Sequence, residues 1–140
     1  FINKYYKPEI PYNLTKHLLK FANSSIDVSD GLIDDLSKMI NKQNLSFHLF
    51  KNKIPVSKNL SNLIKNKKLN KINLISNGDD YQVLFTADFN KARIIQKISK
   101  AIRIKITKIG KIVSGKNRSL IFDKKNKQIQ AKSNGYIHKF

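Results

Sequence analysis

Cysteine is absent from this chain of 140 residues, so neither disulfide bonds nor thiolate metal sites are possible. That absence is compatible with a cytoplasmic protein. No apolar run approaches the length of a membrane-spanning helix, and the first residues show no signal-peptide pattern. We therefore expect a cytoplasmic protein without a membrane partner. The 40% hydrophobic content is typical of a globular domain with its own core.

Acidic residues are few, and the formal net charge is +19. Such a charge favours nucleic-acid binding where basic residues cluster, because they neutralise phosphates. Here arginine occurs only at Arg93, Arg103 and Arg118, while lysine is scattered through every segment together with Asn and Ile. This uniform enrichment is typical of drift toward A/T-rich codons, so we expect no specific nucleic-acid partner. A basic RNA-binding module is the alternative from another class, although the chain lacks an aromatic stacking signature.

Hydrophobic periodicity predicts alternating helices and strands. Helices are expected at about Thr15 to Phe21, from Leu32 onward, after an N-cap at Ser57, and after a cap at Asp88. Strands are expected before Asp30, at 45–50, after an Asn77-Gly78 turn at 81–85, at 104–109 with a bulge near Lys108, and at 119–122. This order predicts an α/β (α+β) fold: a single domain with one mixed sheet and helices packed on one face.

The segment 25–32 joins an apolar strand to the start of a helix. Because side chains alternate along a strand, Asp27 and Ser29 are expected on one face, with Asp30 where the strand ends. Helix N-termini favour anions, and carboxylates beside them can hold a Mg²⁺ ion that bridges to phosphate oxygens. The alternative is that Ser29 or Asp30 simply caps the helix and that Asp27 caps a turn.

Two other patterns do not predict chemistry. Residues 110–117 nearly spell a phosphate-binding loop, but Asn117 stands where Ser or Thr should reach Mg²⁺, and a strand is expected to follow, so we interpret the segment as a turn. The histidines His17, His48 and His138 lack the spacing of a zinc site.

Five blocks of sequence, in order, resemble the C-terminal domain of thiamine-monophosphate kinases, which belong to the aminoimidazole-ribonucleotide-synthetase-related family. The blocks are residues 7–11, 26–32, 54–57, 77–86, and 109–111 leading to 135–140. The second, Ile-Asp-Val-Ser-Asp-Gly-Leu, and the fourth, Asn-Gly-Asp-Asp-Tyr-Gln-Val-Leu-Phe-Thr, are the specific ones. The resemblance implies this family's fold and ATP- and Mg²⁺-dependent phosphorylation of thiamine monophosphate to thiamine diphosphate. Another ATP-using enzyme of the same superfamily is the alternative.

The resemblance also implies roles for individual residues. Asp27 and Asp30 match Mg²⁺ ligands, and Ser29 matches the residue that touches the nucleotide phosphates. Asp79 matches a position that contacts thiamine phosphate and is usually Glu. Tyr136 would line the thiamine end of the site or, alternatively, anchor the terminal tail. No residue is assigned as a general acid or base, because a phosphate oxygen is already a nucleophile.

The sequence departs from the family pattern at three places. Asn77 replaces a glycine, Gln82 replaces a glutamate, and Lys139 is inserted before the final Phe140. None of these removes a metal ligand. The chain begins at Phe1 rather than Met. We therefore expect residues 1–140 to be a C-terminal domain whose upstream N-terminal domain is absent, and to be catalytically incomplete alone. The full-length protein could form a homodimer.

Overall fold

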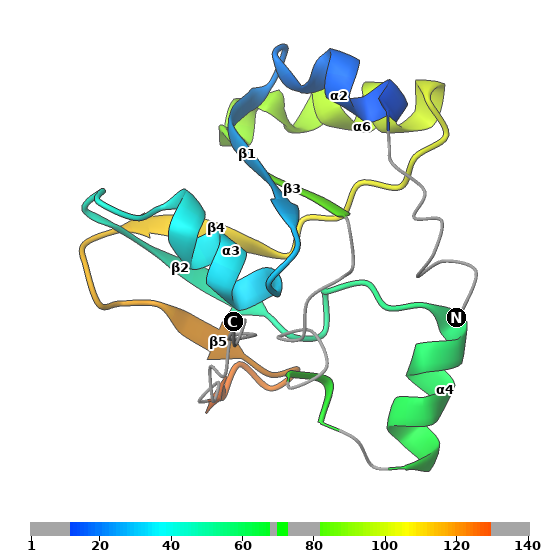
Figure 1. Cartoon of the computed structure of the whole chain (residues 1–140), viewed down its shortest axis with the longest axis vertical. Helices are drawn as coiled ribbons and strands as arrows, with labels where there is room; N and C mark the ends of the chain where they lie inside the picture. The colour runs from blue at the N-terminus through cyan, green and yellow to red at the C-terminus, as the bar shows by residue number, and fades with distance from the viewer. Residues whose placement is uncertain (1–11, 68–69, 73–81, 130–140) are drawn as a thin grey trace, which may run out of the picture.

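The computed structural model describes residues 12–67, 70–72 and 82–129 (Figure 1). Helices and strands alternate along these residues, which confirms the predicted mixed α/β class. The elements are α2 (Tyr12–Leu18), β1 (Ala22–Val28), α3 (Leu32–Met39), β2 (Leu45–Phe50), α4 (Lys58–Asn66), β3 (Gln82–Ala87), the short 3₁₀ helix η1 (Phe89–Lys91), α6 (Ala92–Ala101), β4 (Gly110–Ser114), β5 (Leu120–Phe122) and β6 (Gln128–Ile129). None of the described helices is long and apolar enough to cross a membrane.

The strands form two sheets instead of the single mixed sheet that we expected. β1 and β3 pair antiparallel as a two-stranded ribbon. The other sheet has the order β4-β2-β5-β6 and is mixed, because β2 runs parallel to β5 and antiparallel to β4. Figure 1 shows α2 and α6 side by side next to the ribbon, while α3 lies against the larger sheet.

Each sheet has its own hydrophobic core, and β3 takes part in both. The first core joins α3 to β2 and β5, with Leu36, Phe47 and Ile121 among its buried members. The second core lies between α2 and α6. It includes Phe21, whose ring centroid is 5.1 Å from that of Phe85. Along β3, Leu84 packs on the first core, whereas Val83 and Phe85 pack on the second. The ribbon therefore connects the two cores, one on each of its faces.

The strand expected at 104–109 is wrong, because this segment is irregular and β4 begins only at Gly110. Its polar groups are partly satisfied by the end of α6: the Ser99 hydroxyl donates to the Ile104 carbonyl at 2.7 Å and accepts from the Ile106 N–H at 3.4 Å. The isoleucines still pack, Ile104 and Ile106 on the second core and Ile109 on the first. The alternating isoleucines of this segment therefore pack on the cores although the segment forms no strand.

The structure confirms some of the predicted helix caps, helix ends and turns and corrects others. Ser57 is the N-cap of α4, and its hydroxyl accepts from the Leu60 N–H at 3.2 Å, as predicted. Asp88 occupies the N-cap position of η1, as predicted, but its side chain makes no capping bond and accepts from the Asn23 side chain instead. The helix expected at about Thr15 to Phe21 is α2, which begins at Tyr12, three residues earlier than expected, and ends at Leu18. The segment 110–117, which we interpreted as a turn, is strand β4 over its first five residues and turns only after it, at Gly115, where φ is +99°.

The close pairing of β2 with β4 predicts a steric requirement for glycine at position 110. An added Cβ at Gly110 would collide with the His48 carbonyl oxygen and lie 3.0 Å from Leu49 Cδ2. We expect Gly110→Ala to lower the free energy of unfolding by about 2 kcal/mol, as overpacking typically does. Denaturant unfolding would measure this, with the exposed neighbour Lys111→Ala as control. Equal stability of the two variants would contradict the expectation.

Candidate functional site at the junction of β1 and α3

The predicted site residues lie where β1 ends and α3 begins. Asp27 is exposed on β1, opposite Val83 of β3, while the next residue, Val28, is buried in the first core. Ser29 is also exposed, and Asp30 is half-buried. Gly31 then turns the chain with φ 122°. The strand alternation predicted from the sequence is therefore present, and it leaves Asp27 and Ser29 accessible to solvent.

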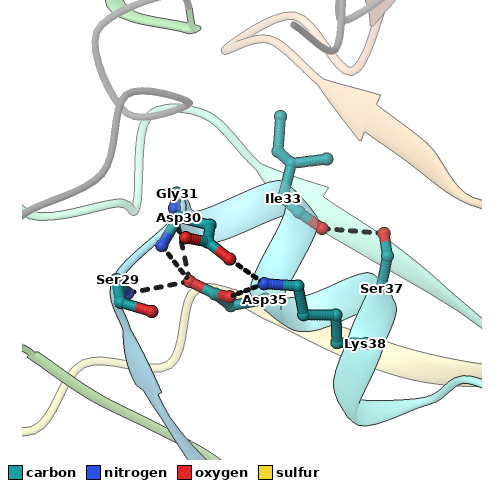
Figure 2. A network of polar contacts seen from close by, with 7 residues as sticks. All are labelled: Ser29, Asp30, Gly31, Ile33, Asp35, Ser37 and Lys38. Carbon is teal, nitrogen blue, oxygen red and sulfur yellow. Dashed lines mark hydrogen bonds and ion pairs between the residues drawn. The ribbon is translucent and has the colours of Figure 1, made fainter. Parts of the chain in front are cut away.

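A carboxylate that the sequence analysis did not identify organises this junction. Oδ2 of Asp35 accepts three backbone hydrogen bonds, from Ser29 at 2.8 Å, Asp30 at 2.9 Å and Gly31 at 3.2 Å (Figure 2). Asp35 is only 1% exposed, so its charge depends on these partners. The sequence could have indicated this role, because Asp35 falls among the buried positions of an amphipathic helix. A buried carboxylate at such a position needs hydrogen-bond partners.

Lys38 completes the network from the last turn of α3. Its Nζ donates to Asp35 Oδ1 at 3.0 Å and forms an ion pair with Asp30 (Figure 2). Burial opposes ionisation of Asp35, but the Lys38 hydrogen bond, the backbone N–H bonds and the nearby ammonium outweigh it and hold the pKa of Asp35 below its ordinary value. The hydrogen bonds to Asp30 and then Asp35 raise the pKa of Lys38, so both groups are charged at neutral pH.

This geometry revises both sequence interpretations of the helix start. The N-cap of α3 is Gly31, which makes no side-chain cap bond, so capping by Ser29 or Asp30 is wrong. The N–H groups of residues 29–31 are also not free for a phosphate, because the protein's own Asp35 accepts them. A phosphate at this junction would instead meet the exposed side chains of Asp27 and Ser29, and through a cation the carboxylate of Asp30.

The donor set fits a magnesium ion that is shared with a phosphorylated ligand. The side chain of Asp27 has no hydrogen bond or ion pair with the described residues, while the Asp30 carboxylate is paired with Lys38. Among the described residues, no three His, Asp or Glu side chains gather as a metal cage. Mg²⁺ commonly binds through one or two carboxylates, retained waters and substrate phosphates. Two carboxylates at a strand end meet that requirement.

Two predicted substrate-binding residues, Asp79 and Tyr136, lie outside the described residues, as does the turn expected at Asn77-Gly78. The described part of the predicted site is therefore Asp27 on β1 and Ser29 and Asp30 on the turn before α3.

Comparison with known proteins gives one consistent result. No protein-family model matches the chain. A thiamine-monophosphate kinase of Buchnera aphidicola subsp. Acyrthosiphon pisum is 34% identical over 122 residues, covering 86% of this chain and 37% of that protein. The enzyme of the same name from Buchnera aphidicola subsp. Schizaphis graminum is 33% identical over 141 residues, covering 98% and 42% respectively. The chain thus spans about two fifths of the length of these curated relatives.

Solved structures share the fold. Thiamine monophosphate kinase from Aquifex aeolicus superposes with a TM-score of 0.70 at 25% identity, over 92% of this chain and 40% of that one. AaThiL complexed with AMPPCP and TMP has a TM-score of 0.70 at 24% identity, over 97% and 40%. The hydrogenase maturation protein HypE from E. coli also superposes, with a TM-score of 0.71 over 88% and 39%, but at 10% identity this shows the fold alone.

The lowered pKa of Asp35 predicts an acid-sensitive contribution to stability. A carboxyl group whose folded pKa is depressed stabilises the fold above its unfolded pKa, near 3.8, and loses this effect as the pH falls through the folded value. We expect Asp35→Asn to lower the free energy of unfolding at pH 7 by about 2 kcal/mol, since buried donors lose a charged acceptor. The free energy of unfolding of the Asp35→Asn variant should also fall less than that of the wild type between about pH 5 and pH 2.

Denaturant unfolding across this pH range would measure both effects. The matched control is Asp34→Asn, which changes the adjacent carboxylate, for which no hydrogen bond or ion pair is present among the described residues. An Asp35→Asn profile parallel to the wild type would show that Asp35 is not the titrating group.

Proposed function

We propose that this chain, which is related to the thiamine-monophosphate kinases, supplies the C-terminal half of the active site of such a kinase. The proposed reaction transfers the γ-phosphoryl group of ATP to the phosphate of thiamine monophosphate, with ADP as the second product. The observation that supports the proposal is the junction of β1 and α3, where Asp27 is exposed near the end of β1 and the backbone of Ser29 and Asp30 is hydrogen-bonded to Asp35. The sequence similarity to enzymes of this name supports the choice of substrate class.

The reaction brings two anionic groups together, so its main requirement is to neutralise and align phosphates. Asp27 and Asp30 would hold Mg²⁺, which supplies positive charge between phosphate oxygens when it is bound. The Ser29 hydroxyl, exposed beside them, would donate a hydrogen bond to a nucleotide phosphate. A phosphate oxygen of the acceptor forms the new bond to the γ-phosphorus as the bond to the ADP oxygen breaks. No side chain is needed as a general base, because this oxygen is already deprotonated.

The chain's own contribution is to fix the positions of these side chains in advance. Asp35 ties the backbone of residues 29–31, so Ser29 and Asp30 are anchored at their main chain, while the Ser29 side chain is exposed and the Asp30 carboxylate is paired with Lys38. Such fixed positioning lowers the entropy cost of aligning two substrates.

The acceptor side of the proposed site rests on the resemblance alone. We assign Asp79 to the thiamine-phosphate side and Tyr136 to the thiamine end. A carboxylate does not favour a bare phosphate, so Asp79 would meet the cationic thiamine portion or act through a bridging metal.

We also propose that the chain alone does not make thiamine diphosphate. It spans about two fifths of its curated relatives, so the other part of such a kinase would supply the remaining metal ligands and the opposite wall of the site. The second candidate is the alternative expected from the sequence, another ATP-using enzyme of the same superfamily; the likeness to HypE supports only the shared fold. The sequence identity favours the thiamine enzyme, because the structural superpositions give 25% for the Aquifex aeolicus enzyme and only 10% for HypE.

The metal role of Asp30 can be tested in a chimera. This chain would replace the matching part of the Buchnera relative, and thiamine diphosphate synthesis would be assayed with varied Mg²⁺. We expect Asp30→Asn to reduce turnover at least about tenfold, because the amide lacks the charge that Mg²⁺ requires. The melting temperature should change little, since an exposed ion pair contributes only up to about 1 kcal/mol. Asp34→Asn is the control, and unchanged turnover in Asp30→Asn at every Mg²⁺ concentration would contradict the assignment.

The same chimera tests the role of Asp79. We expect Asp79→Ala to raise the KM for thiamine monophosphate several-fold and to leave the KM for ATP close to wild type. The reason is that its position matches the acceptor side in the related kinases. If Asp79 only stabilises its turn, both KM values should stay near wild type while the melting temperature falls. A selective increase in the KM for ATP would refute the assignment. Steady-state kinetics with each substrate varied in turn separates these outcomes.

A further inference from the structure

Lys38 places one ammonium group between two carboxylates at the proposed metal site. Its Nζ contacts Asp30 Oδ2 and Asp35 Oδ1, and these are the two ion pairs found among the described residues. The side chain of Lys38 is 50% exposed, that of Asp30 is 34% exposed and that of Asp35 is 1% exposed. The ammonium therefore bridges a solvent-accessible carboxylate and a buried one.

The two carboxylates differ in how easily they can exchange this cation. Oδ2 of Asp35 holds three backbone N–H groups, so moving it would undo the turn before α3. Lys38 is the described partner of the Asp30 side chain, and solvent reaches that carboxylate. Asp30 can thus release the ammonium without any other contact breaking, while Lys38 stays attached to Asp35 at 3.0 Å.

We propose that Lys38 is a tethered counter-ion: it holds the Asp30 carboxylate in place while no metal is bound and yields it to a divalent cation when one arrives. The inference rests on the proposed function, which assigns Asp30 to the metal. Lys38 is a positioning residue in this scheme, because it acts through Asp30 and Asp35. Its ammonium competes for the same carboxylate oxygens as the metal, so it lowers the affinity of the site for divalent cations.

The test is a titration of this chain with Mn²⁺, following free Mn²⁺ by electron paramagnetic resonance. We expect Lys38→Met to bind Mn²⁺ about fivefold more tightly than the wild type, the scale of a partly exposed ion pair. Lys38→Arg keeps the competing cation and should stay near the wild-type affinity. Lys97→Met removes the same charge from an exposed position on α6 and should also match the wild type, which controls for net charge. Asp30→Asn should abolish binding at this site.

A second measurement does not depend on the Met variant folding. The lysines would be labelled with ¹³C-methyl groups, and the Lys38 resonance would be followed by NMR as Mg²⁺ is added. We expect it to shift in the wild type and not in Asp30→Asn, because the exchange occurs at Asp30.

The outcomes separate the inference from the proposed function. Mn²⁺ binding that is lost in Asp30→Asn but equal in Lys38→Met and wild type, with a static Lys38 resonance, would overturn the role of Lys38 alone. Binding unaffected by Asp30→Asn, or absence of binding at millimolar Mn²⁺ in every variant of this chain and also in the chimera with the Buchnera relative, would overturn the metal site at Asp30 and the inference with it. Tighter binding in Lys38→Met, with Lys97→Met unchanged, supports both.

Discussion

The buried carboxylate of Asp35 is the constraint on which the candidate site depends. One oxygen accepts three consecutive backbone N–H groups, and the other receives the Lys38 ammonium. Charge-assisted bonds of this kind offset the cost of burying the carboxylate and fix the turn between β1 and α3. Because the main chain of Ser29 and Asp30 is tied inward, their side chains are left for other partners. The same contact therefore stabilises the fold and positions the main chain of the proposed site residues.

Packing on both sides of the turn keeps this network in place. Val28, the last residue of β1, and Leu32, the first of α3, both belong to the first core. The strand is held in turn by β3, whose Val83 lies opposite Asp27 and packs on the second core. The junction is thus anchored to both cores within a few residues. Sites built on regular elements that are fixed in this way position side chains more precisely than mobile loops do.

The sequence predicted the features that depend on local periodicity. Alternation along the strand placed Asp27 and Ser29 on the exposed face, and the N-cap at Ser57 followed from local hydrogen-bond chemistry. The features it missed depend on distant partners. The strands form two sheets because β1 pairs with β3, which is far from it in the chain. The segment 104–109, which we predicted as a strand, has its Ile104 carbonyl hydrogen-bonded to the Ser99 hydroxyl instead. Asp35 was missed because an acidic residue in the first turn of a helix also fits a solvated position.

The distribution of charge explains why a local counter-ion matters in this chain. Four of its nine acidic residues lie between positions 27 and 35, within a protein whose net charge is +19. The long-range field of such a protein attracts anions and repels free cations, although salt screens it beyond about 8 Å. A nucleotide that carries Mg²⁺ is itself an anion, so the same field would favour its approach while disfavouring the free metal. Lys38 then compensates the carboxylates until that complex arrives, and the metal exchanges with a cation that remains tethered to Asp35. Under the proposed function, the net charge and the ion pairs of the junction would together favour the loaded nucleotide over the free ion.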